Sequence, residues 1–237
     1  MNTRQSDNFS RNHKRLTLGS RLSLCLLEVA SRSIPGSAHP YEDRVLVDEK
    51  VGLFAVADGV TLSSQGSGAV AAELTLSLLR ENFSGDLADG INEAHRIVVR
   101  RRKEDITVGE TTLTAVVVSE GRLQVANVGD SPAYLVRGKK MQSLIVEDKS
   151  PFGYITQVIG YPEAILVHTK SLQLKDQDMV IVASDGVEHV LRSSIVNQLY
   201  SRPKVGEVVD SIIQEARASS TGYDDDKSVI ILRVVER

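Results

Sequence analysis

Short apolar runs joined in pairs by two-residue turns constrain the fold of this chain more than any other feature. The paired runs and their turns are Thr111 to Val118, Glu120-Gly121 and Arg122 to Val128, then Ala133 to Arg137, Gly138-Lys139 and Met141 to Val146. β-rich runs separated by two turn residues are typical of β-hairpins. We therefore expect an antiparallel meander in the middle of the chain.

Further strands and helices are expected on both sides of these hairpins. Strands are predicted within Leu16 to Ala30, at Arg44 to Asp48 and Gly52 to Ala57 on either side of a turn, at Met179 to Ala183 and at Ser228 to Val235. Helical spacing of apolar residues predicts helices over Ser67 to Leu79, through Val70, Leu74 and Leu78, over Ile91 to Val99, near Ile195 and over Val205 to Ala218. Hairpins grouped apart from helices favour antiparallel sheets packed against helices over alternating βαβ units.

Length and charge narrow the class of protein. The 237 residues fit one domain, which we place at residues 16–237, after a polar N-terminal arm at residues 1–15. A net charge of −3 lacks the basic excess of nucleic-acid binding, and no run of about 18 apolar residues predicts a membrane span. The single cysteine, Cys25, is expected in the core of a reduced, cytoplasmic protein.

Acidic residues stand at the ends of several apolar runs. Glu42-Asp43 opens a strand, Asp58 and Asp185 each follow one, and Asp224-Asp225-Asp226 precedes the last. Carboxylates held there by rigid strands can share a crevice and bind Mg²⁺ or Mn²⁺, since hard cations prefer oxygen ligands. Each Asp-Gly pair taken alone also fits an ordinary turn, and spacing within one chain does not prove that the acids converge.

Six stretches containing these residues resemble the type-2C protein phosphatases, the metal-dependent PPM family. In the order of the family they are Tyr41-Glu-Asp-Arg44, Phe54-Ala-Val-Ala-Asp-Gly-Val60, Gly109-Glu-Thr-Thr-Leu-Thr-Ala115, Val125-Ala-Asn-Val-Gly-Asp-Ser-Pro-Ala-Tyr-Leu135, Val182-Ala-Ser-Asp-Gly-Val187 and Asp225-Asp-Lys-Ser-Val-Ile-Ile231. The resemblance covers about residues 42–235, the length of a small microbial-type catalytic domain. It implies an α+β fold: a four-layer α-β-β-α sandwich of two antiparallel sheets flanked by helices.

The resemblance also implies a centre with two divalent cations, Mn²⁺ or Mg²⁺. Carried over by position, Asp58 bridges both ions, and Asp185 and Asp225 complete the shell of the first. Glu42 and the carbonyl of Gly59 serve the second ion. Asp58 and Asp185 are the catalytic residues in this reading, acting through a water held between the ions.

Three further acids belong to the implied site. Asp43 and Asp226 lie in the outer shell, and Asp130 corresponds to the acid that, with Asp185, holds a weaker third ion in microbial members. The implied reaction is hydrolysis of phosphoserine and phosphothreonine by in-line attack of the bridging water. The expected partners are a phosphorylated protein and a cognate Ser/Thr kinase, and the expected state is a monomer.

The chain departs from the family pattern at three positions. Ala38 stands where an Arg usually binds the substrate phosphate, Val60 where some members have a His acid, and Pro132 where an Arg is usual. Arg32 and Arg44 are the guanidinium groups nearest in sequence that could replace the first. These losses keep open an alternative, a weak or inactive pseudophosphatase that binds a phosphoprotein or kinase.

Two smaller questions also remain open at the level of sequence. His39 lies three residues before Glu42 and is either a loop histidine or a group that contacts substrate or moves a proton. Residues 154–160 fall in the variable region that forms a flap in this family. A Ca²⁺-stabilised structural domain is disfavoured because no EF-hand spacing is present.

Overall fold

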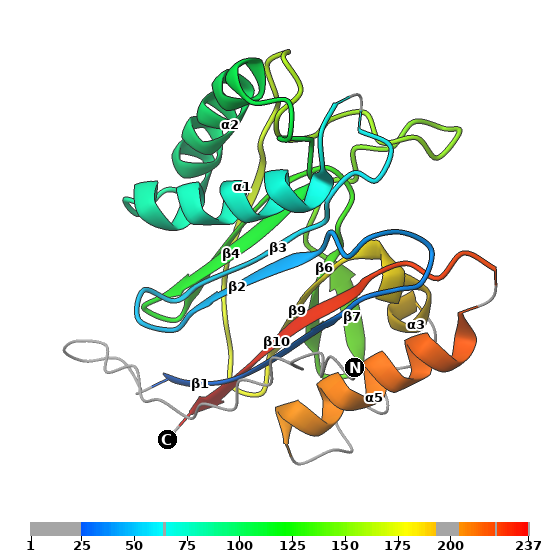
Figure 1. Ribbon diagram of the computed structural model, residues 1–237. Helices are drawn as coiled ribbons and strands as arrows, with labels where there is room; N and C mark the ends of the chain where they lie inside the picture. The colour runs from blue at the N-terminus through cyan, green and yellow to red at the C-terminus, as the bar shows by residue number, and fades with distance from the viewer. Residues whose placement is uncertain (1–24, 64, 193–203, 221, 237) are drawn as a thin grey trace, which may run out of the picture.

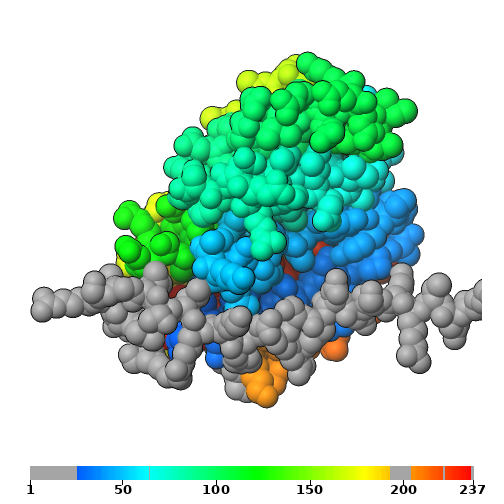
Figure 2. Space-filling model, turned by 60° about the vertical axis from the view of Figure 1, so that its left-hand side comes forward, coloured from blue at the N-terminus to red at the C-terminus, as the bar shows by residue number. Residues whose placement is uncertain are grey.

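Two five-stranded antiparallel sheets face each other, and helices cover the outer face of each one (Figure 1). The computed structural model describes residues 25–63, 65–192, 204–220 and 222–236. The predicted four-layer sandwich is confirmed. In Figure 2, residues 68–104, coloured cyan to green, lie above the blue residues 25–50.

The two sheets are named here after their first strands. The β1 sheet has the order β1 (Cys25–Ile34), β10 (Lys227–Glu236), β9 (Met179–Ala183), β6 (Ala133–Arg137) and β7 (Lys140–Ser143). The β2 sheet has the order β2 (Arg44–Asp48), β3 (Leu53–Ala57), β4 (Leu113–Ser119), β5 (Arg122–Val128) and β8 (His168–Gln173). Helices α1 (Gly68–Asn82) and α2 (Leu87–Glu104) cover the β2 sheet, and the 3₁₀ turn η1 (Asp185–Val187), α3 (Glu188–Arg192) and α5 (Val205–Ser219) cover the β1 sheet.

Three apolar clusters fill the three spaces between these four layers. Alternation along β3 shows how one strand serves two of them, because successive side chains point to opposite faces. Leu53, Ala55 and Ala57 pack toward α1 and α2, whereas Phe54 and Val56 pack toward the β1 sheet. All five are fully buried, so the end of β3 is held firmly from both sides.

The predicted hairpins are confirmed, but the meander is wrong. Glu120 and Gly121 have φ values of 51° and 72°, the left-handed backbone that a two-residue hairpin turn requires. After β5, however, the chain crosses to the other sheet, where β6 pairs with β7 and β9. Turn residues indicate which strands are consecutive, but they do not indicate which sheet each hairpin joins.

Several helix and strand boundaries differ from expectation. The buried side of α1 runs through Ala71, Ala72, Thr75, Leu76 and Leu79, while the predicted Val70 is exposed, because small residues let this helix lie close to the sheet. Helix α2 begins at an Asp86 cap and continues to Glu104. Strand β8 was not predicted, since its outward residues are polar as on many edge strands.

Some predictions concern residues outside the described ranges. The N-terminal arm at residues 1–15, the first part of the Leu16 to Ala30 strand and the helix near Ile195 are among them, and Cys25 is the first residue of β1. Within the described ranges, no helix combines the length and the apolar character needed to cross a membrane.

Candidate metal centre

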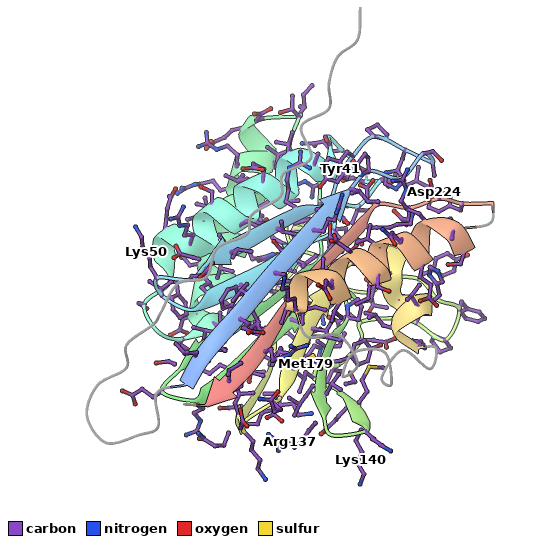
Figure 3. All side chains as sticks on the ribbon, turned by 90° about the horizontal axis from the view of Figure 1, so that it is seen from below. Tyr41, Lys50, Arg137, Lys140, Met179 and Asp224 are labelled. Carbon is purple, nitrogen blue, oxygen red and sulfur yellow. The ribbon has the colours of Figure 1, made fainter. Side chains whose placement is uncertain are left out.

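The predicted acids come from strand ends that the sheet registers bring to one end of the sandwich. Arg44 at the start of β2 pairs with Ala57 at the end of β3, and Val229 near the start of β10 pairs with Ala183 at the end of β9. The segments before β2 and before β10 accordingly lie together on the right of Figure 1. Figure 3 likewise places Tyr41 and Asp224 at one end and Arg137 and Lys140 at the other.

Glu42 faces the N-terminus of α1. Its side chain is 5% exposed, and Oε1 accepts a hydrogen bond of 3.1 Å from the backbone N–H of Gly68, the first residue of the helix. The positive end of the helix dipole favours a carboxylate in this position. The other oxygen, Oε2, is buried without a hydrogen-bond partner and lies 3.6 Å from Nδ1 of His39.

The backbone of Asp58 is clamped by the start of β4. Its N–H donates to Oγ1 of Thr112 at 3.2 Å, and its carbonyl accepts from the Thr112 N–H and from Oγ1 of Thr111, both at 2.8 Å. Gly59 has no positive φ, but a Cβ there would lie 2.4 Å from the carbonyl carbon of Gly68. This glycine is therefore required for the close approach of this segment to α1.

Asp185 and Gly186 form the short turn η1 directly after β9. The Ser184 N–H donates to the carbonyl of Ser228 at 3.0 Å, which joins this turn to the start of β10. A Cβ on Gly186 would lie only 1.9 Å from the carbonyl oxygen of Asp226. Gly186 thus lets the segments that carry Asp185 and Asp225 touch through their backbones.

Replacing Gly186 with alanine is expected to separate these two segments. The clash is with backbone, which cannot move aside as a flexible side chain can, so we expect a loss of stability of about 2–4 kcal/mol. Gly206→Ala in α5 is the matched control: a Cβ there meets nothing within 4 Å, and alanine favours a helix. Thermal unfolding measures the Tm of both variants. A Tm of Gly186→Ala equal to that of the unchanged protein would contradict this contact.

Asp226 holds the loop before β2 rather than facing the centre. Oδ1 accepts from the Gly36 N–H at 2.8 Å, and Oδ2 accepts from the N–H groups of Glu42 and Asp43 at 2.6 and 3.2 Å. The Oδ1 atom of Asp225 lies at hydrogen-bond distance, 2.7 Å, from Nε2 of His39. The outer position predicted for Asp226 agrees with this bracing, and His39 lies between two predicted ligands, Asp225 and Glu42.

The carboxylates at this end repel one another. Burial raises the pKa of Asp43 to about 7, with Asp226 and Asp185 adding to the shift, although nearby Ser228 and Ser184 hydroxyls oppose it. Burial followed by Asp225 and Asp130 raises the pKa of Asp185 to about 6. The pKa of Asp58 is raised well above its usual range by burial and then by Asp43, Asp185 and other neighbours. Such a set favours a compensating cation.

The donor set fits hard divalent cations. Both carboxylate oxygens of Asp43 and one of Glu42 are buried without hydrogen-bond partners, and every predicted ligand atom is oxygen. Within the described ranges no group of three or more His, Cys, Asp or Glu side chains is arranged to hold one ion by itself. One or two carboxylates with several waters is the usual arrangement for Mg²⁺, and the residues here suit it.

A pocket of about 400 Å³ opens beside the acids. Asp185 and Asp225 form part of its wall, together with His189 and Ser219, whose Nε2 and Oγ lie 2.7 Å apart. A larger hollow of about 480 Å³ lies between the start of α2 and strands β5 and β8 and contains none of the predicted ligands. Because only the smaller pocket is lined by predicted ligands, it is the better candidate for the route by which a substrate reaches the acids.

The two arginines proposed as substitutes for the missing phosphate ligand pair with acids of the outer helices. Arg32 pairs with Asp210 of α5 at 2.7 Å, and Arg44 pairs with Glu73 of α1 at 3.1 Å and lies over the ring of Tyr41. Both guanidinium groups are thus engaged by helices on the outer layers. The structure instead places a lysine, Lys149, against Asp130, with Nζ 2.7 Å from Oδ2.

Sequence reasoning missed the groups that support the ligands. Thr112 and Gly68 hold Asp58 and Glu42, and the buried pair of Arg102 and Glu110, 2.9 Å apart, fixes the segment just before Thr111. The Gly109-Glu-Thr-Thr stretch was a signal for them, since it belongs to the resemblance but carries no predicted ligand.

A known protein family matches most of this chain. The family model described as "Stage II sporulation protein E (SpoIIE)" matches residues 60–235. The chain belongs to this family. The predicted PP2C-type phosphatase class is thereby confirmed, although the match begins after Glu42, Asp43, Asp58 and Gly59.

Individual relatives agree with this assignment. The chain is 23% identical to "Serine/threonine phosphatase stp" of Listeria innocua over 78% of this chain and 85% of that protein. It is 25% identical to "Serine/threonine protein phosphatase PstP" of Mycobacterium tuberculosis over 89% of this chain and 46% of that protein. The predicted enzyme class, serine/threonine phosphatase, is thus the class of its named relatives.

Solved structures confirm the fold. The catalytic domain of PstP "in complex with 2 Manganese ions" superimposes with a TM-score of 0.77 at 22% identity, over 90% of this chain and all of that chain. PppA of Pseudomonas aeruginosa superimposes with a TM-score of 0.76 at 20% identity, over 88% and 97%. The sandwich of this SpoIIE-family chain is therefore the PPM phosphatase fold.

Proposed function

We propose that this SpoIIE-family chain is a protein phosphatase that uses two divalent cations, Mn²⁺ or Mg²⁺, to hydrolyse phosphoserine and phosphothreonine. One observation carries the proposal: the buried, mutually repelling carboxylates of Asp58, Asp185 and their neighbours at one end of the sandwich. Burying uncompensated charge is costly, so a fold that only binds a partner gains nothing from keeping them. Two manganese ions in the PstP catalytic domain support the choice of cation.

The chain's own residues have distinct tasks in this proposal. Asp58 would contribute an oxygen to both ions, Asp185 and Asp225 would help to hold the first, and Glu42 with the Gly59 carbonyl would help to hold the second. Asp43, whose two side-chain oxygens are buried, would accept from waters around the ions. Ions bound there would activate a water as nucleophile and neutralise charge on the phosphoryl group.

Holding these groups in place is the main contribution of the fold. Thr112 fixes the backbone of Asp58, Asp226 fixes the backbone of Glu42 and Gly68 holds the Glu42 carboxylate. Because these groups are in place before substrate arrives, little reorganisation accompanies the reaction. Val60 donates no proton, so protonation of the leaving serine or threonine oxygen falls to water or another group. A phosphoprotein substrate, and a kinase that produces it, follow from this activity.

The test is phosphate release from p-nitrophenyl phosphate and from a phosphothreonine peptide, with Mn²⁺, with Mg²⁺ and with EDTA. We expect release that requires a divalent ion and is abolished by EDTA. A phosphotyrosine peptide of the same sequence measures the preference between hydroxyl types. Protein that binds two ions and releases no phosphate from any substrate would contradict the proposal and favour the pseudophosphatase.

A further inference from the structure

Lys149 brings a positive charge to the acid that the resemblance assigns to a third ion. Its Nζ lies 2.7 Å from Oδ2 of Asp130, whose side chain is 3% exposed. The contact is an ion pair without the alignment of a hydrogen bond. The ammonium thus lies against one of the two acids expected to hold that ion.

The position of Lys149 is fixed by its neighbour Asp148. The Asp148 N–H donates to the carbonyl of Gly129 at 3.1 Å, and Oδ2 accepts from the Gly129 N–H at 2.8 Å. Oδ1 lies 2.8 Å from Nε2 of both Gln157 and His168. Residue 148 is therefore attached to the residue immediately before Asp130, which keeps Lys149 beside that acid.

Backbone hydrogen bonds hold Lys149 from its other side. The Thr156 N–H donates to the carbonyl of Asp148 at 2.7 Å, and the Ser150 N–H donates to the carbonyl of Tyr154 at 2.8 Å. Lys149 also forms a β-bridge with Ile155. A lysine on a free loop would sample many positions, but this one starts from a closed, hydrogen-bonded turn.

We propose that the Lys149 ammonium takes the place of a third divalent ion, so this chain binds two ions and not three. The inference rests on the proposed function, because it presumes that the other acids hold two ions. A third ion bound by Asp130 would lie close to the ammonium, which is 2.7 Å from Oδ2 of that acid, and two cations so close together repel. Without the ammonium, Asp130 and Asp185 would present oxygens suited to a hydrated cation.

The experiment counts Mn²⁺ bound to the full chain by equilibrium dialysis with elemental analysis, and follows bound Mn²⁺ by electron paramagnetic resonance. We expect two ions on the unchanged protein and a third, weaker one on Lys149→Met, which keeps side-chain length and loses the charge. Lys139→Met, in the exposed turn between β6 and β7, is the matched control and should still bind two. Circular dichroism and thermal melting establish that each variant folds.

Asp130→Asn gives a second test, made both in the unchanged protein and in Lys149→Met. We expect it to leave the count at two in the unchanged background and to remove the third ion from Lys149→Met. Three ions on the unchanged protein, loss of an ion on Asp130→Asn alone, or a count of two on folded Lys149→Met would each overturn the inference. Failure of the proposed function is measured separately, as no phosphate release from protein that still binds two ions. Unchanged protein that binds no Mn²⁺ would remove the premise of both proposals.

Discussion

Asp185→Ala is expected to lower metal-dependent phosphate release by at least about 10³-fold, a loss on the scale of removing a group that stabilises transition-state charge. Asp185 is the acid that the proposed function places on the first ion, and its pKa of about 6 reflects burial and repulsion from Asp225 and Asp130. Removing it takes away both the ligand and the charge that attracts the cation.

The control for this variant is Asp176→Ala. Asp176 is an exposed acid in the turn between β8 and β9, away from the predicted ligands, and its loss should leave turnover within about twofold. Initial rates with p-nitrophenyl phosphate at saturating Mn²⁺ measure both variants. Substantial turnover by metal-replete Asp185→Ala would remove this residue from the assignment.

The metal-free protein should lose stability as the pH rises from about 5 to 8, and Mn²⁺ should restore more of it at pH 8 than at pH 5.5. Asp43 and Asp185 have pKa values raised to about 7 and about 6. A carboxyl whose pKa is raised by folding stabilises the protein while protonated, and this contribution is lost as the pH passes its folded pKa. For Asp43 the shift corresponds to about 4 kcal/mol at most.

Histidines contribute to the same pH range with opposite signs. His39 has its pKa raised: burial opposes the shift, but the Pro40 carbonyl and Asp225 outweigh it, so its stabilisation also fades as the pH rises. Burial lowers the pKa of His95, whose contribution is instead lost as the pH falls through that range. Because more of these groups have raised pKa values than lowered ones, we expect the stability of the metal-free protein to fall overall as the pH rises.

Thermal melting in EDTA and in Mn²⁺, each at pH 5.5 and 8, measures this effect. We expect the rise in Tm on adding Mn²⁺ to be about 5–10 °C larger at pH 8, given the scale of Tm change per kcal/mol for a chain of this size. Asp43→Asn should raise the metal-free Tm at pH 8 and flatten its pH dependence. A metal-free Tm that climbs steadily from pH 5.5 to 8 would contradict the repulsion described above.

The ends of the strands could be predicted from sequence because they depend on local patterns. Asp58 and Asp185 each follow an apolar run that alternates between two buried faces, which fixes the strand and leaves the acid just beyond it. The family resemblance implied that these acids lie together at one end of the sandwich. The registers of β2 with β3 and of β9 with β10 agree with this placement.

Contacts between distant segments could not be predicted in this way. The Gly68 N–H reaches Glu42, Thr112 reaches Asp58 and Lys149 reaches Asp130 across gaps in sequence that depend on how α1 packs and where the chain crosses between sheets. The meander was wrong for the same reason: nothing in a turn sequence specifies that β6 leaves the sheet of β5. Side-chain charge alone likewise made Arg32 and Arg44 candidates, although both pair with outer helices.

The candidate ligands come from both sheets, since Glu42, Asp58 and Asp130 adjoin β2, β3 and β5 whereas Asp185 and Asp225 adjoin β9 and β10. Any ion shared between the two sets would be a cross-link between layers whose facing sides are packed with apolar side chains such as Phe54 and Val182. Affinity for the ion and cohesion of the inter-sheet core are then one linked equilibrium. A cavity created at Phe54 in the inter-sheet core is therefore expected to weaken cation binding as well as the packing of the two sheets.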